Sequence, residues 1–147
     1  MNAVSIWKRT GLDIAEINRR EEKSLAQHLG VTVIEIGADF VTSSMPVDER
    51  TLQPYGRLHG GASVALAETV GSLAANLTLD PEREIAVGLE INANHVRPVK
   101  GGTVFGTARP EALGRTTQIW SIRIVDDQDR LVCISRLTMA VISVERK

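Results

Sequence analysis

One stretch near the middle of the chain constrains the fold more than any other feature. Residues 58–77, LHGGASVALAETVGSLAANL, are small or apolar except for a single acidic side chain, Glu68, and predict a helix. After it the pattern changes to a period of two in four segments, 84–99, 102–110, 116–126 and 131–144. Short turn sequences, KGG, EALGR and DDQDR, separate them, which indicates an antiparallel sheet with one helix packed against it.

The first third of the chain predicts shorter elements. Residues 12–27 have the pattern of one or two solvated helices, and residues 30–48 that of a strand pair or one bent strand, broken at 37–39. A loop with Pro and Gly follows at 49–61. With 147 residues, the chain suits a single domain, 1–147, of the α+β class with five or six antiparallel strands.

Composition excludes several classes of function. A net charge of −1 and an aromatic content of 3% favour neither nucleic acid nor a membrane surface as a partner. The single cysteine, Cys133, cannot form an intramolecular disulfide, and the three histidines lack zinc-ligand spacing, so we expect no metal. Without a signal-like N-terminus or a run of ~20 apolar residues, the chain is expected to be cytoplasmic.

The surroundings of Glu68 on a helical wheel are unusual. Leu66, Val70, Leu73 and Leu77 lie on the opposite side and are predicted to face the sheet. Within about 60° of Glu68 lie mainly small residues, Gly61, Val64, Ala65, Gly71, Ser72 and Ala75. We therefore expect a second subunit or a ligand to pack on this face, with Glu68 either reactive or merely paired with an arginine at the rim.

Residues near the helix start have two interpretations each. The N–H groups of Gly60 and Gly61 could hold a developing oxyanion, or the glycines could serve only as a flexible helix entry. His59 could donate a hydrogen bond to the same oxyanion, or be only structural. Gln53 could also donate to it, or be only a solvated surface residue. Ser72, one turn beyond Glu68, could orient the acid or a water, or bond back to its own helix.

Other catalytic motifs do not fit. GASVA approaches the GxSxG motif but ends in Ala65, and Ser63 falls on the side of the helix away from Glu68, which makes a serine hydrolase a poor interpretation. YGRLHGG lacks the GK[ST] of a phosphate-binding loop, and DDQDR lacks calcium-loop spacing.

Three segments resemble the hotdog-fold acyl-CoA thioesterases: MPVDERTLQPYGRLHGGASVALAETVGSLAANL, VGLEINANHVRPV and LGRTTQIWSIRI. The resemblance is to the PaaI-like subgroup that acts on aromatic acyl thioesters, which includes 1,4-dihydroxy-2-naphthoyl-CoA thioesterases and proofreading thioesterases of aryl carrier proteins. It extends from about Trp7 to Ile142. It implies a long helix wrapped by the sheet, a homodimer with a continuous sheet, and commonly a homotetramer.

The resemblance also implies roles for individual residues. Glu68 of one subunit would be the general base or the nucleophile, and the Gly60 N–H and the Gln53 amide of the other would polarise the thioester carbonyl. His59 would support this positioning, and Ser72 would assist Glu68 or the water. The CoA thioester is the substrate, so no separate cofactor is expected.

Further substrate and CoA contacts are implied at Gly88, His95, Val96, Arg97, Pro98, Leu113, Gly114, Arg115 and Thr116. Arg97 and Arg115 could pair with the CoA phosphates, and the backbone at Gly114 could approach them closely, although strand-end solvation explains the same residues.

The function expected is therefore hydrolysis of aromatic acyl-CoA. Three alternatives remain: proofreading of aryl carrier-protein thioesters, a hotdog dehydratase, which the Gln, Gly and Glu arrangement disfavours, and a non-catalytic ligand-binding protein.

Overall fold

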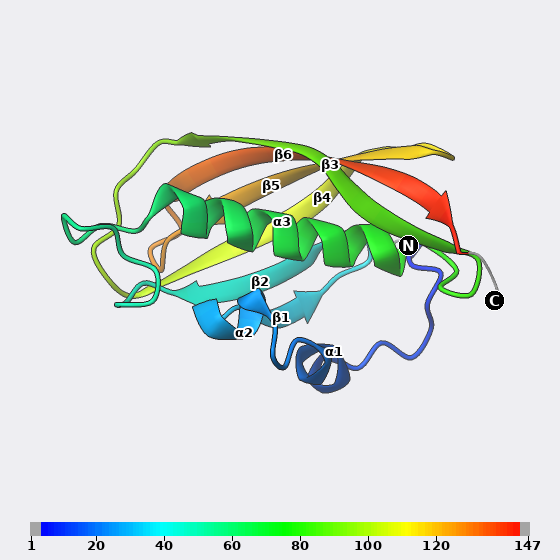
Figure 1. Cartoon of the computed structure of the whole chain (residues 1–147), viewed down its shortest axis with the longest axis horizontal. Coiled ribbons are helices and arrows are strands. Elements are labelled where there is room, and N and C mark those ends of the chain that lie inside the picture. The colour runs from blue at the N-terminus through cyan, green and yellow to red at the C-terminus, as the bar shows by residue number, and fades with distance from the viewer. Residues whose placement is uncertain (1–3, 145–147) are drawn as a thin grey trace.

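The computed structural model describes residues 4–144, which form one curved sheet around one long helix (Figure 1). Its helices are α1 (Ile14–Arg20), α2 (Leu25–Leu29) and α3 (Gly60–Leu77). Its strands are β1 (Thr32–Ile36), β2 (Val41–Pro46), β3 (Glu84–His95), β4 (Thr103–Leu113), β5 (Thr117–Val125) and β6 (Leu131–Ser143). All neighbouring strands are antiparallel, in the order β1-β2-β4-β5-β6-β3. The predicted α+β class and antiparallel sheet are confirmed.

The elements before α3 are two short helices and a strand pair. Asp13 caps α1 by accepting a hydrogen bond from the Ala15 N–H, at 2.9 Å. Ser24 caps α2, which ends at Gly30 in the left-handed conformation. A turn closed by the Gly37 N–H and the Phe40 carbonyl, 2.9 Å apart, joins β1 to β2. Of the alternatives left open by the sequence, the structure has two helices and two strands.

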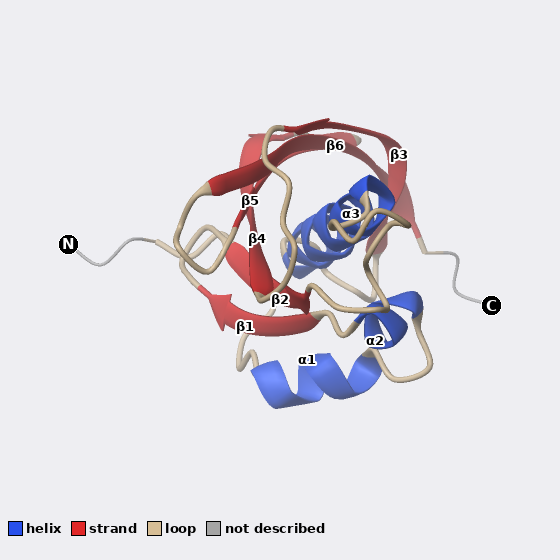
Figure 2. Cartoon of the chain, turned by 90° about the vertical axis from the view of Figure 1, so that its left-hand side faces the viewer, coloured by secondary structure: helices blue, strands red, loops and turns tan. Residues whose placement is uncertain are grey.

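The sheet covers more of α3 than the wheel predicted. Figure 2 shows the strands curving round the helix, with α1 and α2 at the bottom of the view, next to β1. Leu66, Val70 and Leu77 are buried as expected. Gly71 and Ala75, predicted to lie on the face with Glu68, are instead buried against the sheet, and Leu73 is only half-buried. The prediction failed because a wheel assumes a flat partner, whereas a curved sheet contacts a wider arc of the helix.

A close approach fixes the distance between α3 and the sheet. A Cβ atom on Gly71 would lie 2.7 Å from Cδ2 of Leu137, a fully buried residue of β6. At the C-terminal end of α3, Gln118 of β5 donates to the Thr78 hydroxyl and accepts from the Trp120 indole, both at 2.9 Å. The Trp7 ring stacks on Trp120 with centroids 6.4 Å apart. This buried network anchors the N-terminal segment and the helix end to the sheet.

Two predicted boundaries were wrong. β4 continues to Leu113, although EALGR was expected to be a turn, because a bulge between Pro110 and Ala112 restores pairing with β5. β3 ends at His95, before the proline at 98, which lacks the N–H that a strand would need there. The predicted turn at 126–130 is present, closed by the Asp126 carboxylate accepting from two backbone N–H groups.

No helix within residues 4–144 is long and apolar enough to span a bilayer. The same residues contain no group of three His, Cys, Asp or Glu side chains arranged to hold a metal ion.

Candidate active site

Glu68 lies half-buried at the middle of α3, on the side that faces α1 and the edge strand β3. Its side chain lines a cavity of 460 Å³ between these helices, together with Ser72, Leu73 and Ile17. Among the described residues its carboxylate has neither a hydrogen-bond donor nor a cationic partner. The paired-arginine interpretation therefore finds no support, and the carboxylate is free to act on a ligand or a water.

Gly88 of β3 makes room for the Glu68 carboxylate. A Cβ atom at Gly88 would lie 2.6 Å from Oε1 of Glu68, closer than any non-bonded contact permits. The register between β3 and β6 shifts between Gly88 and Glu90, so the bulge occurs where the strand passes the acid. The residue predicted as a substrate contact therefore sits directly beside the carboxylate.

Ser72 lines the same cavity as Glu68, one turn further along α3. Its hydroxyl is 3.8 Å from the Met139 sulfur, a weak acceptor. The hydroxyl is therefore available to a water or ligand in the cavity.

The start of α3 has an unpaired N–H. His59 is the N-cap residue, and its Nδ1 accepts a hydrogen bond of 2.8 Å from the Gly61 N–H. Within the described chain the Gly60 N–H has no acceptor. A Cβ atom on Gly60 would lie 2.9 Å from Nε2 of His95, so the absence of a side chain lets this ring approach the helix end. The arrangement leaves one backbone donor at the positive end of the helix dipole.

Gln53 lies next to this helix end. Its Oε1 accepts a hydrogen bond from the Tyr55 N–H, which leaves the amide NH₂ free to donate. A second cavity, of 380 Å³, brings Gln53, Gly60 and residues 95–98 together. Backbone bonds from Val96 and Arg97 to the Val132 carbonyl, at 2.9 and 3.3 Å, hold that segment to β6.

One chain does not bring these two groups together. Gly60 and Glu68 are eight residues apart on one helix, about 12 Å along its axis, and they line separate cavities. A thioester carbonyl that receives a hydrogen bond from the Gly60 N–H is therefore out of reach of the Glu68 carboxylate of the same chain.

The predicted CoA contacts also fall into two groups. Leu113, Gly114 and Arg115 line a cavity of 390 Å³ with Lys8 and Thr78, at the C-terminal end of α3. Residues 95–98 lie at the N-terminal end, about 27 Å away along the helix. In the turn between β4 and β5, the Thr116 carbonyl accepts from the Val141 N–H of β6, and Gly114 approaches the Thr117 carbonyl. A single chain therefore does not assemble these segments into one nucleotide site.

Sequence reasoning missed Arg9 and Ile17, which line the Glu68 cavity. They belong to the N-terminal segment and to α1, which packs against β1. No local pattern in the sequence shows that these residues pack beside position 68.

Comparison with known proteins agrees with this geometry. The thioesterase superfamily model matches residues 55–133. The 1,4-dihydroxy-2-naphthoyl-CoA hydrolase of Escherichia coli is 47% identical over 93% of this chain and 99% of its own length. The proofreading thioesterase EntH of Cronobacter turicensis is 47% identical over 92% of this chain and 98% of its own. The crystal structure of a Haemophilus influenzae thioesterase superposes with a TM-score of 0.93 at 47% identity, covering 96% of this chain and 97% of that one. The chain therefore belongs to the thioesterase superfamily and is a hotdog-fold thioester hydrolase.

Proposed function

We propose that this protein hydrolyses CoA thioesters of aromatic or hydroxyaromatic acids, such as 1,4-dihydroxy-2-naphthoyl-CoA, to the free acid and CoA, in the cytoplasm. The observation that carries the proposal is the unpartnered Glu68 carboxylate at the wall of a cavity of 460 Å³. That volume lies in the range of about 300–1,000 Å³ typical of small-molecule sites. The apolar side chains of Ile17, Leu73 and Leu77 in its wall suit a ring system, and the E. coli relative named above acts on a bicyclic aromatic thioester.

Glu68 can serve this reaction in two ways. As a general base it takes a proton from water while the water oxygen attacks the thioester carbon, and the C–S bond then breaks to release CoA thiolate. As a nucleophile it attacks that carbon itself, releases the thiolate and leaves a mixed anhydride that water hydrolyses. In both routes the Gly60 N–H and the Gln53 amide donate to the carbonyl oxygen as it gains negative charge.

A second copy of the chain is needed to complete the site. We propose a homodimer in which Glu68 of one protomer acts with Gly60 and Gln53 of its partner, and a homotetramer built from two such dimers. β3 supports this arrangement, because it is a long edge strand of the sheet and carries exposed apolar residues, with Leu89 63% exposed. A long apolar edge strand is normally covered by another strand.

The test is release of thiol from benzoyl, hydroxybenzoyl, hydroxynaphthoyl and aliphatic acyl-CoA, measured with wild type and Glu68→Gln. We expect wild type to prefer the aromatic thioesters and the variant to lose at least ~100-fold in kcat, the range for removing a general base. Because glutamine keeps the shape of the side chain, an unchanged melting temperature excludes unfolding as the cause. A variant as active as wild type would overturn the assignment of Glu68.

Thioesters of an aryl carrier protein are the second candidate substrate, since the chain is 47% identical to an EntH proofreading thioesterase. The comparison that decides between them is kcat/KM for one aryl group presented on CoA and on a carrier protein. A higher value for the carrier-bound thioester would make proofreading the function.

A further inference from the structure

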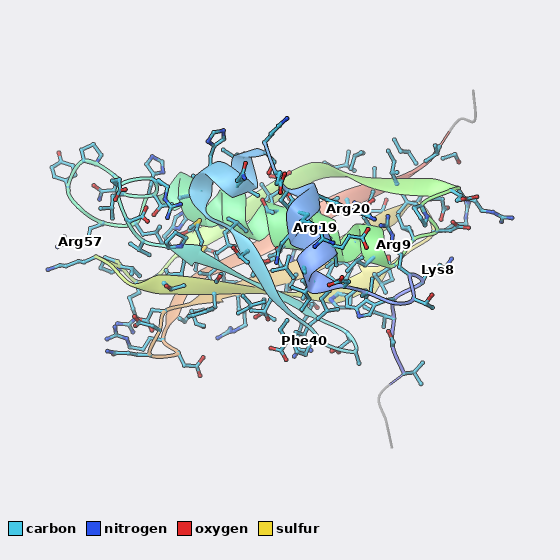
Figure 3. The ribbon with its side chains drawn as sticks, turned by 90° about the horizontal axis from the view of Figure 1, so that it is seen from below. Lys8, Arg9, Arg19, Arg20, Phe40 and Arg57 are labelled. Carbon is cyan, nitrogen blue, oxygen red and sulfur yellow. The ribbon has the colours of Figure 1, made fainter. Side chains whose placement is uncertain are left out.

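Arg9 is placed at the end of the Glu68 cavity but has no partner there. It lines that cavity and a smaller neighbouring one of 150 Å³, and Arg20 lines both as well. Figure 3 shows Arg9, Arg19 and Arg20 beside α1. Arg20 forms an ion pair with Glu16, one turn earlier on α1. Arg9 forms no ion pair within residues 4–144, and its Nε is buried without a hydrogen-bond acceptor.

A buried, unpaired guanidinium nitrogen is unusual. Buried polar groups are normally hydrogen-bonded, because a buried donor without an acceptor loses its hydrogen bond to water and gains none in return, which costs most for a charged group. The other acid lining this cavity, Glu21, already accepts a hydrogen bond from Ser24, at 3.1 Å. The end of the cavity at Arg9 therefore holds a guanidinium with a free hydrogen-bond donor.

Arg9 and Glu68 lie near opposite ends of the cavity. The Lys8 N–H donates to the Leu77 carbonyl at 3.0 Å, which holds this segment against the last turn of α3. Leu77 follows Glu68 by nine residues, about 14 Å along the helix. The half-buried Leu73 and Ile17 line the space between. The cavity thus has a carboxylate near one end and a guanidinium near the other, and between them the apolar Leu73 and Ile17 lie beside the polar Ser72 and Asn76.

We propose that Arg9 determines specificity by donating a hydrogen bond to a hydroxyl or carboxylate oxygen on the end of the acyl group remote from the thioester. The proposal rests on the proposed function, since it takes Glu68 to mark the thioester end. An aromatic ring would lie against Ile17 and Leu73. An acyl group without the remote oxygen would leave the Arg9 donor unpaired, which is how a polar pocket rejects an analogue that lacks the matching group.

The experiment compares kcat/KM for matched pairs of acyl-CoA: benzoyl with hydroxybenzoyl and carboxybenzoyl, and naphthoyl with hydroxynaphthoyl. Arg9→Met keeps the alkyl stem but removes the donor and the charge. We expect it to lower kcat/KM for the oxygen-bearing thioesters about tenfold or more, as for loss of a charged hydrogen bond, while the unsubstituted ones change little. Arg9→Lys should recover part of the preference for the oxygen-bearing thioesters. Comparison of hydroxybenzoyl-CoA with carboxybenzoyl-CoA shows whether Arg9 binds a hydroxyl or a carboxylate.

Arg19→Met is the matched control, because Arg19 is an exposed arginine of α1 that lines neither cavity. Arg19→Met should leave the ratio of kcat/KM within each matched pair of acyl-CoA at the wild-type value. Equal losses for every acyl group in Arg9→Met would overturn the proposal and show that Arg9 binds the CoA portion or supports the fold. Unchanged ratios would also overturn it.

Binding of the free acids, measured by calorimetry, separates this proposal from the proposed function. If wild type hydrolyses no aromatic thioester, yet binds the hydroxy acids more tightly than Arg9→Met does, the proposed function fails and the role of Arg9 stands. Equal affinity in wild type and variant contradicts the role of Arg9 whatever the turnover.

Discussion

At the scale of single residues, a missing side chain matters as much as a present one. Gly88 does not have a positive φ, so its conformation does not require glycine. Glycine is needed there because it leaves space for the Glu68 carboxylate. The neighbouring atom is the end of a flexible side chain, which can rotate away from an added methyl group. Enlarging residue 88 should therefore disturb the chemistry more than the fold.

Gly88→Ala tests this separation of activity from stability. The added Cβ should displace Oε1 of Glu68 and lower kcat at least about tenfold, since small misplacements of a reacting group are costly. The melting temperature should change by only a few degrees. Gly101→Ala is the control, because an added Cβ there meets no atom within 4 Å. It should leave kcat and the melting temperature unchanged. A fully active Gly88→Ala enzyme would contradict the close approach.

Cys133, the only cysteine in the sequence, provides a second test at this scale. Burial raises the pKa of its thiol, so at any given pH less of the reactive thiolate is present than for a free cysteine. We expect alkylation by iodoacetamide at pH 8 to be slow in the native protein and fast in denaturant. Native labelling at the rate of a small thiol would show that β6 opens readily.

At the scale of elements, α3 is built to lie close to a curved sheet. Its buried positions are mostly small, and Gly71 packs directly against Leu137. Glycine lowers helix propensity by about 1 kcal/mol relative to alanine, so its presence in mid-helix reflects packing. The short distance between helix and sheet in turn determines how deeply Glu68 sits.

Gly71→Ala should destabilise the protein even though alanine favours the helix. Overpacking a filled core costs about 1–3 kcal/mol, which exceeds the gain in propensity of about 1 kcal/mol. We expect a net loss of about 1 kcal/mol in the free energy of unfolding, measured in urea. Thr69→Ala, at a half-buried position that faces the Glu68 cavity, should instead be neutral or stabilising. A more stable Gly71→Ala protein would show that the sheet moves away from α3 to accommodate the added methyl group.

At the scale of the whole molecule, the separation between Glu68 and Gly60 makes the proposed site a property of two chains. Glu68→Gln and Gln53→Ala should each be nearly inactive alone. After co-expression or mixed refolding, half of the dimers are hybrids, and each hybrid has one site with both residues intact. Activity should therefore recover to about a quarter of the wild-type value. A mixture no more active than its components would show that each chain works alone.

Much of the architecture was predictable because it depends on local periodicity. In the last four strands, alternate side chains face the core, which produces the period of two in the sequence. The run of small and apolar residues before them reflects the packing of α3 on the sheet. Gly60 and Glu68 could be singled out because a lone acid in an apolar helix and glycines at its start are visible in the sequence, whereas the role of Gln53 was implied by the family resemblance. The boundaries at residues 95 and 113 were missed because a bulge and the loss of strand pairing depend on neighbouring strands.

By itself, the sequence determined the fold class, the order of the elements and the identity of the candidate catalytic residues. Only the tertiary structure decided which side of α3 is buried, how Gly88 admits the carboxylate, and that Arg9 faces the cavity of Glu68. These features arise where segments far apart in the chain meet on a curved sheet. Sheet curvature is a collective result of strand twist, which no single stretch of sequence specifies.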